Sequence, residues 1–246
     1  MQHVLVLGGG VGGTLVANLI SRKIKKQIDA GEAKVTVVDE FGEHVYQPGF
    51  MYIAMGNEDP KSLRKPERRL LDDRVELVID EVTAIDEKAQ KIARATGDTL
   101  ESDYLILATG SRIRPETIEH IEQEAHHFYR AQAAGRLRKA LDGFTGGKVV
   151  VGIASMPYKC PPAPLEVALL IEAELRERGL RDKSEVHFCS PIARAFTIES
   201  VSEMVTPELE KKDIELHTFF NVETIDAERK VVQSLEGEEL EYDLLV

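Results

Sequence analysis

Cysteine is scarce in this sequence: Cys160 and Cys189 are its only two, so no disulfide framework holds the fold. There is also no run of the roughly 18 apolar residues that a membrane-spanning helix needs. Basic residues are fewer than acidic ones, 31 against 43, and the net charge of −12 argues against nucleic acid and anionic membranes as electrostatic partners. A glycine motif begins so close to Met1 that no signal peptide fits ahead of it, so we expect the protein in the cytoplasm or at the cytoplasmic face of a membrane.

The most informative pattern lies in the first residues. An apolar strand, residues 4–7, runs into the spacing G-x-G-x-x-G, and a helix is predicted from residue 14 to about residue 30. The glycines of the motif are Gly8, Gly10, Gly12 and Gly13. Gly8 permits a tight turn, Gly10 lets the backbone approach a pyrophosphate, and Gly13 lets helix and strand pack closely. The pyrophosphate would then lie at the positive helix N-terminus.

A second apolar strand, residues 35–38, ends at Asp39, whose carboxylate is placed to accept hydrogen bonds from a ribose 2′-hydroxyl. This order of strand, glycine loop, helix, strand and acid predicts a dinucleotide-binding unit. A glycine-rich hairpin turn is the alternative, but it explains neither the helix nor the acid.

The next segments are less specific. Residues 41–56 contain aromatic and amphipathic side chains, and they either fold over a flat ligand or form an ordinary surface loop. Residues 61–73 indicate a charged helix or linker, in which the charge run 64–69 forms a solvated face. A strand is predicted at 75–79.

One organisation occurs twice in the sequence. A strand at 82–86, a turn at Gly97-Asp98 and a buried strand at 104–107 lead into the small tripeptide Ala108-Thr109-Gly110. Residues 222–246 repeat this order. Each copy predicts a β-meander whose last strand rejoins a central sheet.

Between the meanders lies a second strand–loop–helix–strand unit. Its elements are predicted at 148–153, 165–178 and 185–189. Together the patterns predict an α/β protein of two Rossmann-like dinucleotide-binding-type domains with β-meander insertions, at residues 1–113 and 114–246. Because the second meander stops at Val246 inside a strand, we expect the chain to be a fragment that is truncated at its C-terminus.

The second unit lacks the glycines of a phosphate-binding turn. Residues 154–166 read Ala-Ser-Met-Pro-Tyr-Lys-Cys-Pro-Pro-Ala-Pro-Leu-Glu, whose prolines lack N–H groups and whose side chains obstruct a phosphate cradle. NAD(P)H should therefore not bind here in the usual way. Cys160 precedes a helix and adjoins Lys159, and both features favour the thiolate. The alternative, a buried structural thiol, fits a Cys-Pro-Pro loop poorly.

Two further residues of this unit have competing interpretations. Glu166 lies in the first turn of the predicted helix, where the helix dipole alone would favour an acid. Cys189 lies in an apolar strand, so we expect a buried inert thiol that does not pair with Cys160.

The whole chain resembles the flavoproteins of the disulfide reductase superfamily that have two dinucleotide domains, through the glycine motif, Asp39 and Ala108-Thr109-Gly110. Residues 158–166 resemble the active-site segment of sulfide:quinone oxidoreductases and flavocytochrome c sulfide dehydrogenases. The resemblance implies FAD over the glycine motif and Asp39, with its adenine near Val82. No cysteine lies in residues 41–51, where relatives attach flavin, so the FAD is expected to be non-covalent.

The resemblance also implies an activity. It makes Cys160 one of two redox cysteines and Glu166 an acid/base, in an enzyme that oxidises sulfide to sulfur or polysulfide and passes the electrons to a membrane quinone. The second redox cysteine, the quinone site and the segments that attach the protein to a membrane surface are expected beyond Val246. No metal site is expected.

Some of these enzymes have a third essential cysteine where this chain reads His126-His127-Phe128-Tyr129, so we expect a two-cysteine subtype. The two histidines either lie near the site or form a solvated loop pair. Four other functions stay open. They are a flavocytochrome subunit, which would need export; a type II NADH:quinone oxidoreductase, disfavoured by the missing glycines; another FAD-dependent pyridine nucleotide-disulfide oxidoreductase; and an inactive flavin-binding scaffold. A homo-oligomer is also open.

Overall fold

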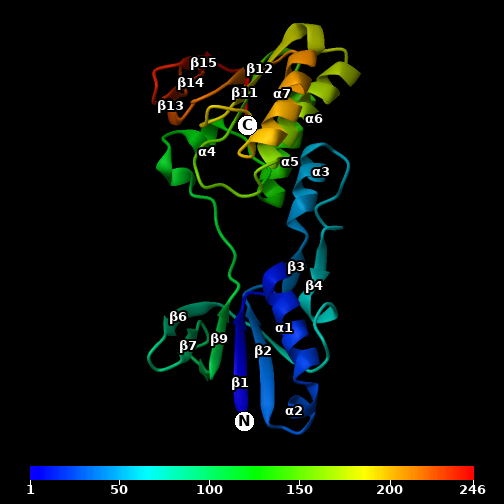
Figure 1. The fold of residues 1–246 in the computed structure, drawn as a ribbon, viewed down its shortest axis with the longest axis vertical. Helices are drawn as coiled ribbons and strands as arrows, with labels where there is room; N and C mark the ends of the chain where they lie inside the picture. Colours follow the sequence, from blue (N-terminus) through cyan, green and yellow to red (C-terminus); the bar gives the residue numbers. More distant parts are fainter. The chain divides into compact units, whose positions relative to one another are not determined.

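The structure is a computed structural model that describes residues 1–246. By their internal contacts, the residues form two units (Figure 1). The first comprises residues 1–46 and 60–112, and the second comprises residues 47–59 and 113–246. The segment 47–59, which lies inside the first predicted domain, thus groups with the second unit. No helix in either unit has the length and apolar character needed to cross a membrane.

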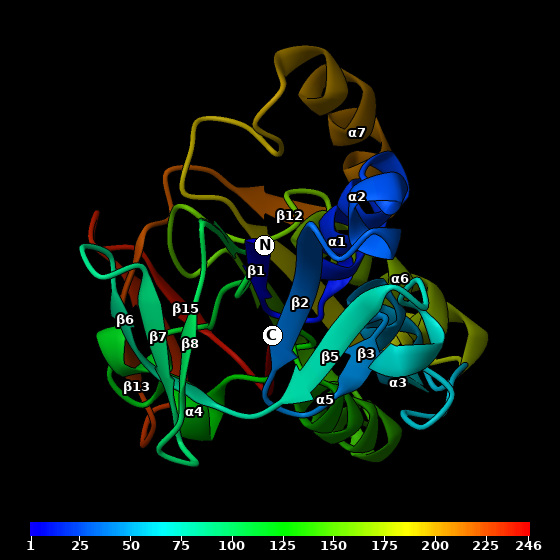
Figure 2. The same cartoon turned by 90° about the horizontal axis from the view of Figure 1, so that it is seen from below.

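The first unit is built on a parallel sheet in the order β5-β2-β1-β9, whose first three strands lie side by side in Figure 2. The strands are β1 (Gln2–Leu7), β2 (Ala33–Asp39), β5 (Val75–Ile79) and β9 (Tyr104–Leu107). Valine and leucine dominate β1 and β2 because a parallel sheet is covered on both faces. Helix α1 (Val11–Lys23) packs one apolar face on this sheet through Val16 and Ile20.

The predicted helix at 14–30 is wrong in both its start and its continuity. Helix α1 begins at Val11, directly after the glycine loop, and a separate helix α2 (Lys25–Asp29) follows. The break falls at Ile24, whose ψ of 25° leaves the helical region. Apolar residues continue at helical spacing across the break, so the periodicity alone did not reveal it.

The segment between β2 and β5 also differs from its prediction. Residues 41–56, predicted as a loop, contain β3 (Glu43–Val45), a 3-10 turn (Gln47–Gly49) and α3 (Phe50–Ala54). In place of a charged helix or linker, β4 (Arg64–Pro66) pairs antiparallel with β3, and a 3-10 turn (Glu67–Arg69) follows. The prediction of a solvated face is wrong at Glu67, which is fully buried. Hydrogen bonds from Thr14 and His44 to its carboxylate compensate for the lost contact with water.

The meander of the first unit is confirmed. Its antiparallel strands are β6 (Val82–Asp86), β7 (Lys91–Arg94) and β8 (Thr99–Glu101), with the turn at Gly97. Ile92 packs with Leu5, Leu7 and Val38, so the meander covers one face of the sheet.

The second unit repeats this plan, as predicted. Its parallel sheet has the order β12-β11-β10-β16, which matches β5-β2-β1-β9 position by position. The strands are β10 (Gly147–Gly152), β11 (Ser184–Cys189), β12 (Ile214–His217) and β16 (Leu244–Leu245). The antiparallel meander is β13 (Val222–Asp226), β14 (Val231–Ser234) and β15 (Glu239–Glu241). The α/β class and the two Rossmann-like sheets are therefore confirmed.

The helices of the second unit include α6, which connects β10 to β11 and begins two residues before the prediction. The helices are α4 (Ile121–Glu124), α5 (Ala131–Gly143), α6 (Ala163–Glu177) and α7 (Glu199–Lys211), with 3-10 turns at Pro115–Thr117 and Arg181–Lys183. Leu165, Ala168 and Ile171 are buried on α6, which accounts for its packing on the sheet.

Candidate functional site

The glycine loop of the first unit spans residues 8–10, between β1 and α1. Gly8 has a φ of +101°, and a Cβ there would lie 2.4 Å from the carbonyl oxygen of Ala108. A Cβ on Gly13 would lie 1.8 Å from the carbonyl oxygen of Gly8. A Cβ on Gly10, by contrast, would meet nothing within 4 Å. The fold therefore requires Gly8 and Gly13, whereas Gly10 leaves free space at the start of a helix, where a phosphate group binds.

Asp39, at the end of β2, holds the glycine loop in place. Its Oδ2 accepts a hydrogen bond from the Gly9 N–H at 2.8 Å, and its Oδ1 accepts one from the Gly42 N–H at 2.7 Å. Oδ1 also accepts a hydrogen bond from the Phe41 N–H at 3.1 Å, so of the roughly four lone-pair sites of a carboxylate the one that stays available for a hydroxyl group is on Oδ2. The predicted contact to a ribose stays a prediction, and the structure adds a positioning role that the sequence did not indicate.

The tripeptide Ala108-Thr109-Gly110 leaves the sheet at the end of β9. The Ala108 N–H donates to the Leu7 carbonyl at 2.8 Å, and the Ala108 Cβ lies 3.4 Å from the Cβ position of Gly13. A larger side chain at this position would meet the start of α1. The structure thus brings the glycine motif, Asp39 and the tripeptide together at the carboxyl ends of β1, β2 and β9, where ligands bind in parallel sheets. Val82 packs on a cluster that includes Leu7 and Val38, the residues before Gly8 and Asp39, and its predicted contact to the adenine stays a prediction.

Three residues that the sequence did not single out connect to the glycine loop. The Thr14 hydroxyl donates to Glu67 Oε1 at 2.6 Å, and His44 Nδ1 lies 3.2 Å from Glu67 Oε2. His44 Nδ1 also lies 3.1 Å from the carbonyl oxygen of Gly9. Because both neighbours of this nitrogen are acceptors, it carries a proton. No local pattern could have revealed a network whose members lie so far apart in the chain.

The second candidate site is the loop of residues 153–162 between β10 and α6, at the position that the glycine loop has in the first unit. Cys160 is exposed, has a φ of +54°, and accepts a hydrogen bond through its carbonyl from the Ala163 N–H at 2.9 Å. The neighbouring Lys159 extends its ammonium to Gln47 Oε1, at 3.4 Å. The structure therefore places the Cys160 thiol in reach of solvent, at the entrance to α6.

The other two residues of the second unit also lie where the sequence indicated. Glu166 is exposed in the first turn of α6, and its N–H donates to the Pro162 carbonyl. Cys189 ends β11 with an exposed fraction of 1%, which confirms the predicted burial. Burial raises the pKa of the Cys189 thiol far above its usual range, and the charges of Glu238 and Glu215 add to this effect. Cys189 is therefore kept as a thiol.

The segment that precedes α5 contributes a residue that the sequence reasoning missed. The Tyr129 hydroxyl donates to the carbonyl oxygen of Lys159 at 2.9 Å, which ties this segment to the Cys160 loop. Burial raises the pKa of Tyr129 to about 12, with smaller contributions from Cys160 and Tyr158. The hydroxyl thus keeps its proton and works as a donor.

His126 and His127 are not a solvated loop pair, because both are half-buried. Burial, with the positive charges of Arg136 and Arg130, lowers the pKa of His127 to about 4. Burial, with Arg136, also lowers the pKa of His126. Both rings are therefore neutral near pH 7.

A family model described as pyridine nucleotide-disulphide oxidoreductase matches residues 2–246. The chain belongs to this family. The mouse mitochondrial sulfide:quinone oxidoreductase is 24% identical over 225 residues, which cover 89% of this chain and 49% of that protein. The structure of the sulfide:quinone oxidoreductase from Aquifex aeolicus matches with a TM-score of 0.84 and 24% identity, over 98% of this chain and 56% of that one. A type II NADH:quinone oxidoreductase from Staphylococcus saprophyticus is 27% identical over 142 residues, which cover 57% of this chain and 34% of that protein.

The predicted resemblance and the predicted cofactor are confirmed by these matches. FAD is the cofactor, and the glycine loop fits it: Gly10 leaves space open at the start of α1, where Gly8 and Gly13 hold the backbone in place. The chain spans about half the length of the sulfide:quinone oxidoreductases that it matches.

Proposed function

We propose that the protein is a sulfide:quinone oxidoreductase. The observation that carries this proposal is the exposed Cys160 at the entrance to α6, in a loop that replaces the phosphate-binding turn of the second unit. The mouse and Aquifex aeolicus relatives, which align along most of the chain, support the same reaction.

Cys160 forms a sulfur bridge with a second redox cysteine in the proposed reaction. Sulfide attacks this bridge, a new S–S bond forms to the incoming sulfur, the older S–S bond breaks, and one cysteine departs as a thiolate. Restoring the bridge releases two electrons, and the added sulfur leaves as sulfur or polysulfide. FAD, when bound, carries the electrons to the quinone, which takes up two protons.

Other residues of the Cys160 loop support this chemistry. The exposed Glu166 carboxylate, in the first turn of α6, takes the proton that sulfide loses. The Tyr129 hydroxyl fixes the Lys159 carbonyl and with it the backbone that carries the thiol. Cys189 is buried and protonated, so we propose that the second redox cysteine, the quinone site and any attachment to a membrane surface belong to parts of the protein outside residues 1–246.

A type II NADH:quinone oxidoreductase is the second candidate, because a relative with that name matches part of the chain. The Cys160 loop argues against it. Pro157, Pro161 and Pro162 have no N–H to donate to a phosphate, and no glycine follows β10 to let a pyrophosphate approach.

Anaerobic stopped-flow mixing of the full-length protein with either donor separates these two functions. Sulfide should bleach the flavin absorbance, and NADH should leave it unchanged over the same period. Fast bleaching by NADH together with none by sulfide would overturn the proposed function.

A further inference from the structure

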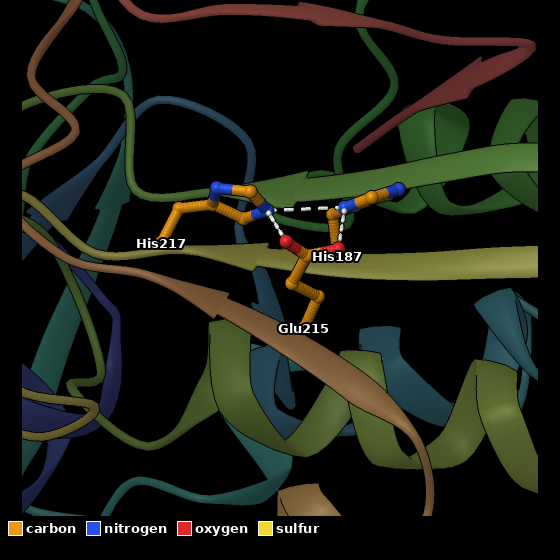
Figure 3. A group of neighbouring side chains, drawn as sticks. All are labelled: His187, Glu215 and His217. Atoms are coloured by element: carbon orange, nitrogen blue, oxygen red, sulfur yellow. Dashed lines mark hydrogen bonds and ion pairs between the residues drawn. The ribbon is translucent and has the colours of Figure 1, made fainter.

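Two histidines and a glutamate of the second unit converge on one face of the sheet (Figure 3). In the parallel pair β11 and β12, His187 lies opposite Glu215 and Cys189 lies opposite His217. Alternate residues of a strand share a face, so the three side chains project to the same side. This cluster could not be predicted from the sequence, since His187 and His217 lie on different strands.

The distances within the cluster are near those between ligands of one metal ion. His187 Nδ1 lies 3.0 Å from His217 Nε2 and 3.4 Å from Glu215 Oε2, and His217 Nε2 lies 3.8 Å from Glu215 Oε1. Ligands at about 2.0–2.2 Å from a tetrahedral Zn²⁺ are separated by roughly 3.3–3.6 Å. The two glutamate distances go to different oxygens, and with one ligand atom from each residue the three atoms lie within 4.8 Å of one another. A rotation of the exposed Glu215 side chain would bring one oxygen to the ion.

The tautomer of His217 directs a lone pair into the cluster. Its Nδ1 lies 2.5 Å from Glu238 Oε1, and because a carboxylate only accepts, this nitrogen carries the proton. Nε2 is then unprotonated and faces His187 and Glu215. A carboxylate behind the far nitrogen is the usual arrangement of a metal-bound histidine, since it fixes the ring and strengthens the ligand. The Glu238 N–H is in turn held by the Ser234 hydroxyl at 3.1 Å.

One ring nitrogen of His187 has no hydrogen-bond partner. With Nε2 of His217 unprotonated, Nδ1 of His187 must donate to it, so that Nε2 of His187 has no proton. This Nε2 atom is buried without a hydrogen-bond partner, on a side chain that is only 9% exposed. A metal ion on Nδ1 would take the place of that proton. Nε2 would then carry a hydrogen directed at Glu185 Oε2, which lies 3.6 Å away.

The local charge also favours a cation. Glu185, Glu215 and Glu238 bring three carboxylates to the two rings. Two neighbouring cations pair with other acids: Lys148 pairs with Glu241 at 2.8 Å, and Arg229 pairs with Glu239 at 2.7 Å.

A cavity of about 240 Å³ adjoins the cluster at His187. His187 lines this cavity together with Lys148, Arg229 and residues of β15.

We propose that His187, Glu215 and His217 bind a divalent transition-metal ion, with Glu238 orienting His217. Two imidazole nitrogens and one carboxylate oxygen suit Zn²⁺, which would keep a fourth position for water. The ion would tie β11 to β12 and, through Glu238, to the turn between β14 and β15. It is separate from the proposed sulfur chemistry.

Zinc binding to the full-length protein tests this proposal. The protein is stripped with a chelator, its exposed thiols are alkylated, and Zn²⁺ is titrated against a chromophoric competitor. The wild type should bind one ion at this site, and a His217→Gln variant should lose it. Glu238→Gln should bind about 10–100-fold more weakly, because only the orienting group is removed. His120→Asn, which changes an exposed histidine outside the cluster, is the matched control and should bind as the wild type does.

Two further measurements distinguish a loss of zinc binding from a loss of the fold. Glu215→Gln changes a side chain that is 66% exposed, so the fold should survive while the affinity falls. Zinc should also raise the melting temperature of the wild type and of His120→Asn, and leave that of Glu215→Gln nearly unchanged. A wild type that binds no zinc, or variants that all bind it equally, would show that the cluster is only a histidine pair bridged by a proton.

Discussion

Replacing Gly13 by alanine would place a methyl group 1.8 Å from the carbonyl oxygen of Gly8. A Cβ atom essentially never lies closer than 3.0 Å to such an atom, so the start of α1 must move away from the Gly8 carbonyl by about 1.2 Å. The opposing atom is backbone, and no side-chain rotation can relieve the overlap. The retreat would loosen the packing of Val16 and Ile20 on the sheet.

The cost follows from two opposing contributions. Overpacking in a closely packed region costs about 1–3 kcal/mol or more, and the rigid backbone puts Gly13→Ala at the upper end. The higher helix propensity of alanine stabilises the folded protein by at most about 1 kcal/mol, which offsets part of this cost. We therefore expect the free energy of unfolding of the apoprotein to fall by about 2 kcal/mol.

Gly10→Ala is the matched comparison, because the same methyl group meets nothing within 4 Å there. Its unfolding free energy should stay within about 0.5 kcal/mol of the wild type, while its flavin content falls because the methyl group occupies the approach of the pyrophosphate. Urea unfolding of the apoproteins and the flavin absorbance of the purified proteins measure both effects. If Gly13→Ala unfolds as the wild type does, or Gly10→Ala retains full flavin, the assigned roles of these glycines are wrong.

Two further predictions concern the second unit. Burial lowers the pKa of His127 from 6.5 to about 4, so between these pH values the unfolded chain binds a proton at this ring and the folded chain does not. The contribution of the neutral ring to stability is therefore complete above pH 6.5 and is lost as the pH falls toward 4. Urea midpoints measured between pH 7 and pH 4 should decline less steeply in His127→Gln, and equal slopes would refute the assigned burial effect. Glu166→Gln should slow sulfide-dependent turnover at least about 10-fold and move the acid limb of its pH profile, if the carboxylate transfers a proton. An unchanged pH profile would show that Glu166 transfers no proton and only interacts favourably with the helix dipole.

Those parts of the fold that depend on local pattern could be predicted from the sequence. Most strands of the two sheets are short apolar runs, and the meanders have turn glycines such as Gly97, so strand periodicity and turn chemistry located them. Strand β12, in which apolar and polar side chains alternate over four residues, was not predicted. The segment between β2 and β5 could not be predicted in this way. Its pairing of β3 with β4 joins residues far apart in the chain, and buried Glu67 depends on Thr14 and His44.

The candidate sites show the same division. The glycine motif, Asp39 and Cys160 could be identified because each belongs to a recognisable pattern of neighbouring residues. The hydrogen bond from Tyr129 to Lys159 and the cluster of His187 with His217 could not, since each joins segments that meet only in the folded unit. The half-burial of His127 likewise depends on tertiary packing, which a polar dipeptide does not reveal.

Sulfide-dependent reduction of a soluble quinone by Cys160→Ser tests the central proposal most directly. A serine hydroxyl has no accessible anion at neutral pH and cannot enter a sulfur bridge, so turnover should fall to background while FAD content stays at the wild-type level. Cys189→Ala, the matched control at a buried thiol, should keep most of the wild-type rate. Wild-type turnover in Cys160→Ser, or a loss confined to Cys189→Ala, would contradict the assignment of Cys160 as the redox cysteine.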